Sequence, residues 1–284
     1  MSASSDVTNK QIAGLRDFSG RLLLLGAGKM GSALLEGWLD LGLDASRVAV
    51  LEPLPSPAIE ALTGRGLCLN PELQALGAID VIVLAVKPQI AAEAIAPLAA
   101  MVRATTLIVS IMAGRTLQFL SAATDNVGAL VRAMPNTPAA IGRGITVAVP
   151  RRAGLAQREL AHRLLSATGA VEWIEDEALM DAVTAVSGSG PAYVFLLAEV
   201  LAQVGIAAGL PPGLAEKLAR ETVAGSGELL HRSPLAAARL RENVTSPGGT
   251  TAAALDILMG KNGLGPLLQE AVAAATARSR QLAG

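Results

Sequence analysis

A short segment near the start of the chain has the glycine spacing that binds a pyrophosphate. Gly26-Ala27-Gly28-Lys29-Met30-Gly31 follows an apolar run at 21–25 and opens an amphipathic run at 30–41. In that setting the first glycine permits a tight turn, the second lets a pyrophosphate approach the backbone, and the third lets the helix pack closely on the strand. The helix N-terminus then faces the phosphates. The segment predicts a dinucleotide-binding loop, and a glycine turn without ligand is the alternative.

Glu52 and Ser56 follow the next apolar run, 48–51, and are candidates for contact with the cofactor. A carboxylate about 20 residues after the last glycine commonly takes the adenosine ribose 2′-hydroxyl. By charge alone Glu52 favours NADH, because a carboxylate repels the 2′-phosphate of NADPH. The Pro-rich turn between them allows a second arrangement, in which Glu52 points to solvent and Ser56 meets a phosphate. A plain surface carboxylate is the third alternative.

A second loop combines glycines with hydroxyl side chains. Ser246-Pro247-Gly248-Gly249-Thr250-Thr251 runs directly into a helical pattern at 252–259. Backbone N–H groups at a helix N-terminus lack partners within the helix and can hold a carboxylate without an arginine. The loop is therefore a candidate anion site, although Ser and Thr also cap ordinary turns.

Further candidates lie where expected strands end, at the edge of a parallel sheet that binds ligands. Ala85-Val86-Lys87-Pro88 offers a lysine to a phosphate, to a substrate carboxylate or only to solvent. Met112-Ala113-Gly114 has small residues that would leave room for a nicotinamide. Asn136 lies within Pro135–Pro138, whose prolines would hold its amide in one orientation. An asparagine turn without ligand is the alternative.

The elements that must position these residues alternate in the first half of the chain, as is typical of a parallel sheet flanked by helices. Expected strands are 21–25, 48–51, 78–86, 106–111, 128–134, 145–149 and 170–174, and expected helices are 30–41, 58–63, 89–101 and 116–122. The predicted class is α/β, a Rossmann-type, doubly wound, mostly parallel sheet followed by an all-helical C-terminal dimerisation domain. The predicted domains are a flexible leader at 1–20, a dinucleotide-binding domain at 21–174, and a helical substrate-binding and dimerisation domain at 175–284.

The second half consists of Ala- and Leu-rich stretches without a convincing strand. Its segment 187–191 resembles a helix start, with Pro191 at the first helical position. The apolar stretch 193–208 carries Glu199 and Gln203, so we expect a buried helix rather than a membrane span. Aromatic residues make up only 2% of the chain, so few large side chains can fill a monomeric core. We expect these helices to pack against a second subunit, with a compact monomeric bundle as the alternative.

The composition excludes several classes of function. Its 23 Lys and Arg against 24 Asp and Glu leave a net charge of −1, so we expect neither nucleic acid nor a membrane as partner. One cysteine, Cys68, in an apolar run that we expect to be buried, and two histidines leave too few ligands for an ordinary zinc site, so no metal is predicted. The polar first residues lack the apolar core of a signal peptide, so we expect a cytoplasmic protein.

The ordered motifs of the chain resemble those of one known family. They are Asp80 to Gln89, Met134 to Pro138, Ser187 to Tyr193 and Val244 to Thr251. Together they resemble the signatures of pyrroline-5-carboxylate reductases over roughly residues 26–282. The resemblance implies an NAD(P)H-dependent oxidoreductase, with NADPH or NADH as cofactor, that reduces Δ1-pyrroline-5-carboxylate to L-proline in the final step of proline biosynthesis.

The resemblance also implies roles for residues. In the family, backbone amides of the segment that matches 246–251 hold the substrate carboxylate, and the residue that matches Thr251 lies near the ring nitrogen. Since a threonine hydroxyl is a poor acid, Thr251 is expected to orient the ring or relay a proton. The implied substrate contacts are Lys87, Ser246, Gly248, Gly249, Thr250 and Thr251. The candidate cofactor contacts are Gly26, Ala27, Gly28, Lys29, Met30, Gly31, Glu52, Ser56, Ala85, Val86, Lys87, Pro88, Met112, Ala113, Asn136 and Asn243. A homodimer is the implied building block, with a decamer as a higher assembly.

Other interpretations stay open beside this one. A hydroxyacid or 6-phosphogluconate type dehydrogenase shares the domain order but uses a lysine in the first long helix of its helical half, and residues 191–210 contain no lysine. A reductase of another cyclic imine would fit the same motifs. A non-catalytic nucleotide-sensing protein would explain the glycine loop at 26–31 but not the second loop at 246–251.

Overall fold

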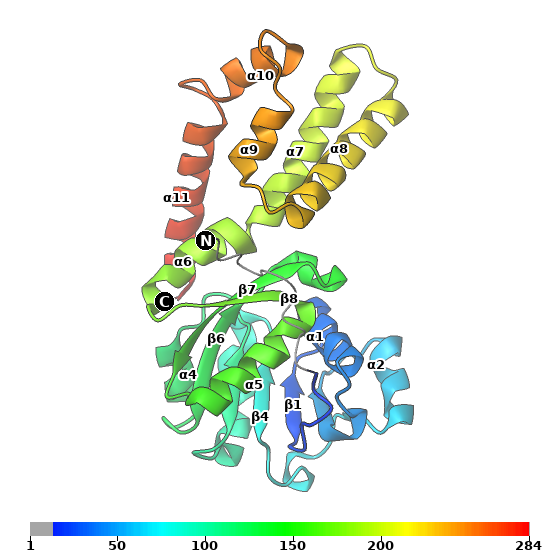
Figure 1. Cartoon of the computed structure of the whole chain (residues 1–284). Coiled ribbons are helices and arrows are strands. Elements are labelled where there is room, and N and C mark those ends of the chain that lie inside the picture. The colour runs from blue at the N-terminus through cyan, green and yellow to red at the C-terminus, as the bar shows by residue number, and fades with distance from the viewer. Residues whose placement is uncertain (1–13, 284) are drawn as a thin grey trace, which may run out of the picture. The chain divides into compact units, whose positions relative to one another are not determined.

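A computed structural model describes residues 14–283 of the chain (Figure 1). The chain divides into two compact units. The first, called here the sheet unit, contains the chain up to Thr184 and also the last residues, from Arg280 onward. The second, the helical unit, spans Ala185–Ser279. The limits 21–174 and 175–284 that we expect for functional domains stay a prediction.

The sheet unit is built on one eight-stranded sheet in the order β3-β2-β1-β4-β5-β6-β7-β8. The strands are β1 (Leu22–Leu25), β2 (Val48–Leu51), β3 (Cys68–Leu69), β4 (Val81–Leu84), β5 (Leu107–Ser110), β6 (Ala129–Met134), β7 (Gly144–Arg151) and β8 (Gly169–Trp173). Every neighbouring pair is parallel except β6 with β7. The carboxyl ends of β1, β2, β4, β5 and β6 therefore meet at one edge. This confirms the predicted doubly wound, mostly parallel sheet.

The central strands β1, β2, β4 and β5 are buried on both faces of the sheet, which explains why they read as uninterrupted apolar runs. Along β1, Leu22 and Leu24 join a core cluster that contains Trp38, whereas Leu23 and Leu25 join a second cluster. Alternate side chains of a strand point to opposite faces, so the clusters lie on the two sides of the sheet. The helices of the unit are α1 (Lys29–Asp40), α2 (Pro57–Ala61), α3 (Ala91–Ile95), α4 (Leu117–Ala123), α5 (Leu155–Leu165) and α6 (Met180–Val183).

Two helices of the sheet unit differ from the expectation. Of the helix predicted at 89–101 only α3 is α-helical, and 3₁₀ turns lie on both sides of it. Pro88 and Pro97 stand at the starts of those turns, where the missing N–H interrupts α-helical hydrogen bonding. The helix α5 was not predicted. A glutamine three residues after the N-cap is a sequence pattern of helix starts, and here the Gly154 N–H donates to Gln157 Oε1 at 3.0 Å.

The prediction that Cys68 is buried is wrong, since this residue is exposed. It lies on β3, a two-residue strand at the edge of the sheet. The preceding Leu67 is buried. Neighbouring residues of a strand face opposite sides, so an apolar run at an edge strand buries only some of its members.

The leader predicted at 1–20 is not loose over its last part, and its first thirteen residues lie outside the described chain. Leu15 is 0% exposed and belongs to the core cluster of β1. Asp17 accepts a hydrogen bond from Arg163 on α5 at 3.2 Å. This bond lowers the pKa of the Asp17 carboxyl. Burial of one leucine and an ion pair therefore hold residues 14–20 on the sheet unit.

The helical unit confirms the all-helical second half. It contains α7 (Gly190–Ala207), α8 (Pro212–Arg232), α9 (Ala237–Asn243), α10 (Thr250–Leu258) and most of α11 (Leu264–Ala283). A π-helical turn, Thr184–Gly188, leads into α7, and the Tyr193 hydroxyl donates to the Ala185 carbonyl at 3.0 Å. Such turns widen the helix locally and free backbone groups for other partners.

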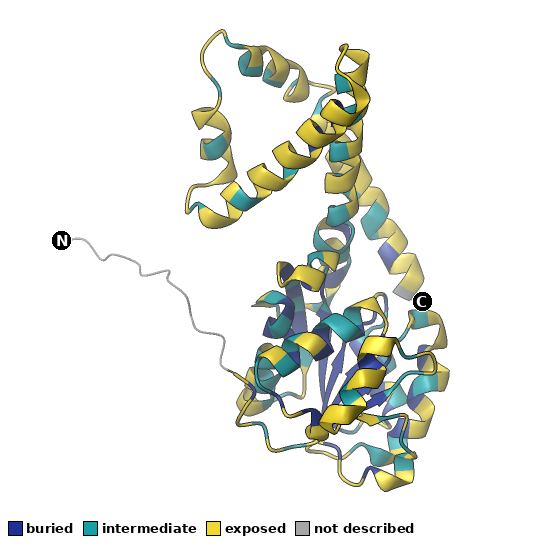
Figure 2. Ribbon diagram, turned by 90° about the vertical axis from the view of Figure 1, so that its right-hand side faces the viewer, coloured by how far each residue is buried: buried dark blue, intermediate teal, exposed yellow. Residues whose placement is uncertain are grey.

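The expectation that the apolar helix at 193–208 is buried is wrong for the single chain. None of the residues of α7 is buried, and Phe195 and Leu197 are 66% and 49% exposed. Figure 2 shows most of the helical unit in the colour of exposed residues. The continuous helical stretch Glu177–Ala207 is also long and apolar enough, by length and composition alone, to cross a membrane. It exceeds the length that the sequence pattern indicated because the helix continues from α6 through the π-helical turn.

Candidate functional site

The glycine loop lies between β1 and α1, as predicted, and its glycines meet different surroundings. Gly26 has a φ of +91°, and a Cβ there would lie 2.9 Å from the Ala85 carbonyl, so only glycine fits. A Cβ at Gly31 would collide with the Gly26 carbonyl oxygen. Gly28 is exposed, and nothing lies within 4 Å of its Cβ position. The loop is thus tightly built on the protein side and open at Gly28, as a phosphate cradle requires.

Backbone hydrogen bonds hold the loop to the neighbouring strand ends. The Gly26 N–H donates to the Leu51 carbonyl at 2.9 Å, and the Ala85 N–H donates to the Leu25 carbonyl at 2.8 Å. The ends of β1, β2 and β4 are therefore joined at the ligand-binding edge. Lys29 and Met30 open α1 directly after Gly28, and Lys29 is exposed.

Glu52 is directed toward the glycine loop. Its Oε2 accepts the Ala27 N–H at 2.8 Å, and its Oε1 accepts the Leu54 N–H at 3.1 Å. Ser56 instead caps α2, where its Oγ accepts the Ile59 N–H at 3.4 Å. Of the arrangements left open by the sequence, the structure has the one in which the carboxylate lies beside the glycine loop.

The segment 85–88 is tied to the strand end beside it. Lys87 is exposed at the carboxyl end of β4. The Pro88 carbonyl accepts the Arg115 Nε–H at 2.9 Å, and the Arg115 guanidinium lies 4.7 Å above the Phe119 ring centroid. Arg115 was not among the residues singled out in the sequence. Its cation–π contact and hydrogen bond fix the loop that carries Lys87.

At the end of β5, the segment 112–114, which we expect to leave room for a nicotinamide, is only partly open. Ala113 is exposed, but Met112 is buried and its N–H donates to Ser110 Oγ at 3.3 Å. Gly114 has a φ of +72°, and a Cβ there would lie 3.3 Å from the Leu282 carbonyl oxygen of α11. The free space at this strand end is therefore at Ala113, and the end of α11 lies against Gly114.

Asn136 has the fixed orientation that its flanking prolines predict. Its Oδ1 accepts the Ile145 N–H of β7 at 2.9 Å. This bond uses one acceptor site of the side-chain amide and leaves the NH₂ group as a donor. Asn136 and Ile145 lie nine residues apart, on either side of the turn between β6 and β7, so the motif around Asn136 did not reveal its anchor.

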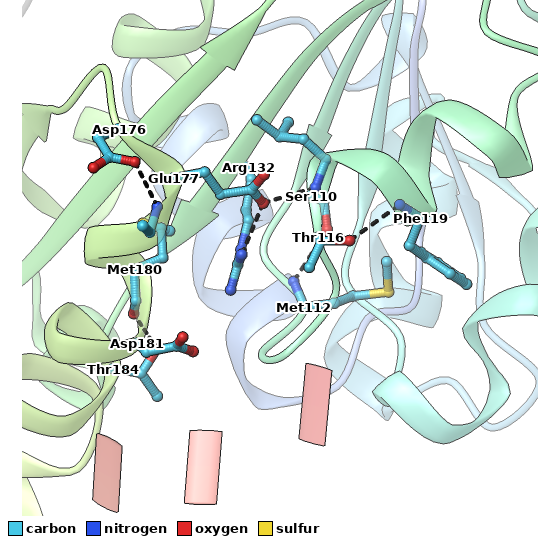
Figure 3. A network of polar contacts seen from close by, with 12 residues as sticks. Ser110, Met112, Thr116, Phe119, Arg132, Asp176, Glu177, Met180, Asp181 and Thr184 are labelled. Atoms are coloured by element: carbon cyan, nitrogen blue, oxygen red, sulfur yellow. Dashed lines mark hydrogen bonds and ion pairs between the residues drawn. The ribbon is translucent and has the colours of Figure 1, made fainter. Parts of the chain in front are cut away.

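A partly buried ion pair that the sequence did not indicate lies beside these strand ends (Figure 3). Arg132 of β6 is 5% exposed and donates to Glu177 Oε1 at 2.8 Å. The same oxygen accepts the Leu117 N–H of α4 at 2.7 Å. Glu177 therefore fastens the segment that follows β8 to two elements of the sheet unit. Nothing in local sequence marks this pair, because its members are far apart in the chain.

The second predicted loop lies in the helical unit. Gly248 has a φ of +70°, and Gly249 is the N-cap of α10 and donates its N–H to the Ser246 carbonyl at 3.0 Å. Thr250 and Thr251 form the first turn of α10, where backbone N–H groups lack helical partners. Asn243 ends α9 just before the loop and is exposed.

The residues predicted as contacts thus fall in two groups. The glycine loop, Glu52 and the ends of β4, β5 and β6 belong to the sheet unit, whereas Asn243 and 246–251 belong to the helical unit. Over residues 14–283, no group of three or more His, Cys, Asp or Glu side chains is placed to hold a metal ion. The donors present are backbone amides, hydroxyls and side-chain amides, which suit anionic organic ligands.

Comparison with protein families gives two matches. Residues 21–114 match the family described as NADP oxidoreductase, coenzyme F420-dependent, and residues 177–282 match the family described as pyrroline-5-carboxylate reductase dimerisation. The doubly wound sheet with its open glycine loop places the protein in the class of NAD(P)H-dependent oxidoreductases. The dimerisation match covers α7 and the helices that follow it, and it indicates that the chain forms oligomers.

Similar proteins narrow the class to one family. The chain is 37% identical to a pyrroline-5-carboxylate reductase of Pseudomonas aeruginosa over 265 residues, 93% of this chain and 97% of the relative. It is 44% identical to one of Synechocystis over 204 residues, 72% and 75% of the two chains. A solved pyrroline-5-carboxylate reductase from Coxiella burnetii superposes with a TM-score of 0.86 at 30% identity, covering 93% of this chain and 99% of that one. The chain belongs to the pyrroline-5-carboxylate reductase family.

A further solved relative carries a cofactor. The Plasmodium falciparum pyrroline carboxylate reductase with NADP bound has a TM-score of 0.78 at 29% identity, over 94% of this chain and 99% of that one. The exposed, unobstructed Gly28 and the free first turn of α1 fit such a dinucleotide.

Proposed function

We propose that this protein reduces Δ1-pyrroline-5-carboxylate to L-proline with NADPH or NADH, the final step of proline biosynthesis. The observation that carries the proposal is the pairing, in one chain, of an open glycine loop for a dinucleotide with a helix-start loop for a carboxylate. Membership of the family, whose relatives are named for this substrate, supports it. A protein that only senses nucleotides would not need the second loop.

The substrate is held through its carboxylate. The N–H groups of Thr250, Thr251 and the residue after them point out of the N-terminus of α10, where the helix dipole also favours an anion. Gly248 and Gly249 leave the backbone free of side chains at this point. Ser246 contributes a hydroxyl beside them, and Lys87 adds a cation to the substrate or to a phosphate.

Thr251 orients the ring and passes on a proton. The bound cofactor supplies a hydride equivalent to C5 of the C=N bond, which accepts it when the ring nitrogen is protonated. The Thr251 hydroxyl can hydrogen-bond the ring nitrogen and relay a proton from water to it. One hydride and one proton convert the imine to the ring amine of proline, so no protein nucleophile is required.

The remaining predicted contacts position the cofactor. The backbone of 26–31 takes the pyrophosphate, the ends of β4 and β5 at 85–88 and 112–113 line the nicotinamide ring, and the Asn136 amide donates to it. Asn243 is a further proposed cofactor contact. We further propose a homodimer as the building block, with a decamer as its higher assembly, and the cytoplasm as its location.

The test is turnover with the purified protein. Loss of reduced nicotinamide is followed with Δ1-pyrroline-5-carboxylate and each cofactor, for wild type, Thr251→Ala and Thr251→Ser. We expect substrate-dependent turnover, a fall in kcat of about 100-fold in Thr251→Ala, and partial rescue in Thr251→Ser, because removal of a proton-relaying group commonly costs this much.

Thr276→Ala serves as the matched control. Its hydroxyl donates to the Val272 carbonyl within α11, so the variant removes a helix-bonded threonine and should keep turnover. Folded wild-type protein that binds a cofactor but shows no turnover would contradict the proposal. It would favour another cyclic imine or a sensing role.

A further inference from the structure

Four hydrogen bonds hold the backbone and the carboxylate of Glu52 in place. The Glu52 N–H donates to Asn70 Oδ1 at 2.8 Å, and Asn70 Nδ2 donates to the Glu52 carbonyl at 2.9 Å. These two bonds fix its backbone at the end of β2. The carboxylate is fixed separately, by the N–H groups of Ala27 and Leu54. Both its position and its direction are therefore set before any ligand arrives.

The carboxylate occupies the position that distinguishes the two nicotinamide cofactors. It lies on Ala27, between the glycines that carry the pyrophosphate, at the end of the second strand, where the adenosine ribose binds in this fold. Two carboxylate oxygens can accept about four hydrogen bonds, and two are used by the backbone. The remaining acceptor sites suit the 2′- and 3′-hydroxyls of a ribose.

A 2′-phosphate finds the opposite conditions here. It brings negative charge and acceptor oxygens to a carboxylate that donates no proton when ionised. Residues 53–64, which follow Glu52, contain no Lys or Arg to offset that charge. Arg65, the next basic residue, shares its pocket with the Glu36 and Asp40 carboxylates. The Ser56 hydroxyl oxygen already caps α2.

We infer that Glu52 makes this enzyme selective for NADH over NADPH. The inference rests on the proposed function only in requiring that a nicotinamide dinucleotide binds at the glycine loop. It assigns to Glu52 both a favourable contact with the ribose hydroxyls of NADH and an electrostatic penalty against the 2′-phosphate of NADPH. The NADP-bound relative from Plasmodium falciparum shows that membership of the family does not itself select NADH.

The experiment measures binding without substrate. The Kd of NADH and of NADPH is determined by calorimetry for wild type, Glu52→Gln and Glu60→Gln. Glu60 is an exposed residue of α2, so its variant removes the same charge near the site without touching the glycine loop. We expect wild type and Glu60→Gln to bind NADH about 10- to 100-fold more tightly than NADPH, which is the size of one close charge repulsion at a partly exposed site. In Glu52→Gln that ratio should fall below about threefold, mainly because NADPH binds more tightly.

Three further steps keep the test informative if Glu52→Gln fails to fold. Thermal unfolding of Glu52→Gln reports whether the loop survives, and Glu52→Ser offers a smaller neutral replacement. Wild type alone is also titrated with ADP-ribose and with its 2′-phosphorylated form, which differ only at the group in question. Tighter binding of ADP-ribose supports the inference without any variant.

Equal or tighter binding of NADPH or of the 2′-phosphorylated fragment by wild type would overturn the inference. So would a selectivity ratio that is the same in Glu52→Gln, Glu52→Ser and wild type. These outcomes leave the proposed reaction intact, since either cofactor can drive it. Failure of the reaction would instead show as absent turnover with both cofactors.

Discussion

At the scale of single residues, each of the three glycines in the glycine loop is required for a different physical reason. Gly26 and Gly31 are required by the protein itself, because a side chain at either would strike backbone atoms. Gly28 has ordinary extended angles, with a φ of −66°, and open space at its Cβ position. The protein itself therefore does not require a glycine at this position, whereas close approach of a pyrophosphate to the backbone does.

This difference gives a prediction for paired variants. Gly28→Val should lose cofactor binding, because its side chain would occupy the space of the pyrophosphate, and should lower the free energy of unfolding by only about 1 kcal/mol through the poorer N-cap of α1. Gly31→Ala should lower the free energy of unfolding by about 1–3 kcal/mol, as overpacking commonly does. Calorimetric binding and thermal unfolding of both variants check this. A Gly28→Val protein that binds NADH as wild type does would contradict the assignment of the loop.

At the scale of elements, α7 is apolar around much of its circumference and is exposed in the single chain. Its partner within the helical unit, α8, buries only Ala215 and Ala219. Small residues allow close helix contact but bury little apolar area. We therefore expect much of the stability of these helices to come from surface that another subunit covers, in the region matched to reductase dimerisation.

The prediction for this element is a loss of assembly. Leu197→Glu should weaken subunit association by about 2 kcal/mol or more, equivalent to about 30-fold in Kd, because a charge would be buried in an apolar interface. Leu155→Glu is the matched control, since Leu155 is 89% exposed on α5 of the sheet unit. Light scattering should show a smaller mass for Leu197→Glu only. An unchanged mass for both variants would exclude α7 from the interface.

At the scale of the whole molecule, the two units differ in how they obtain their cores. The sheet unit has buried clusters on both sides of its sheet, whereas the helical unit has few buried side chains of its own. We expect association of subunits to contribute to the folding of the helical unit. Stability that depends on association must depend on protein concentration.

We therefore expect the unfolding temperature of the wild-type protein to rise by about 2–5 °C when its concentration is raised about 100-fold. Leu155→Glu should show the same rise, and Leu197→Glu should show its transition at a lower temperature for each concentration. Scanning calorimetry or circular dichroism at several concentrations measures this. A transition that is independent of concentration would mean that the helical unit is stable without a partner.

Features of this protein with local causes could be predicted from its sequence. The strand β1, the glycine loop and the start of α1 follow one another within a few residues, so turn chemistry and apolar periodicity sufficed to predict them. The same holds for the loop before α10 and for the all-helical second half. The motifs that resemble the reductase family are also contiguous, so the order of residues along the chain is enough to reveal them.

Tertiary structure alone decided which distant groups meet. The Glu52 carboxylate could point to solvent or to the loop, and packing of β2 beside β1 brought it to Ala27. The pair Arg132 and Glu177, and the anchoring of Asn136 by β7, likewise join segments whose spacing in the chain carries no periodic signal. None of the residues of α7 is buried in the single chain, although its apolar sequence predicted burial. Hydrogen bonds and burial depend on three-dimensional distance, and apolar pattern along the chain reports only which face is apolar, not what covers it.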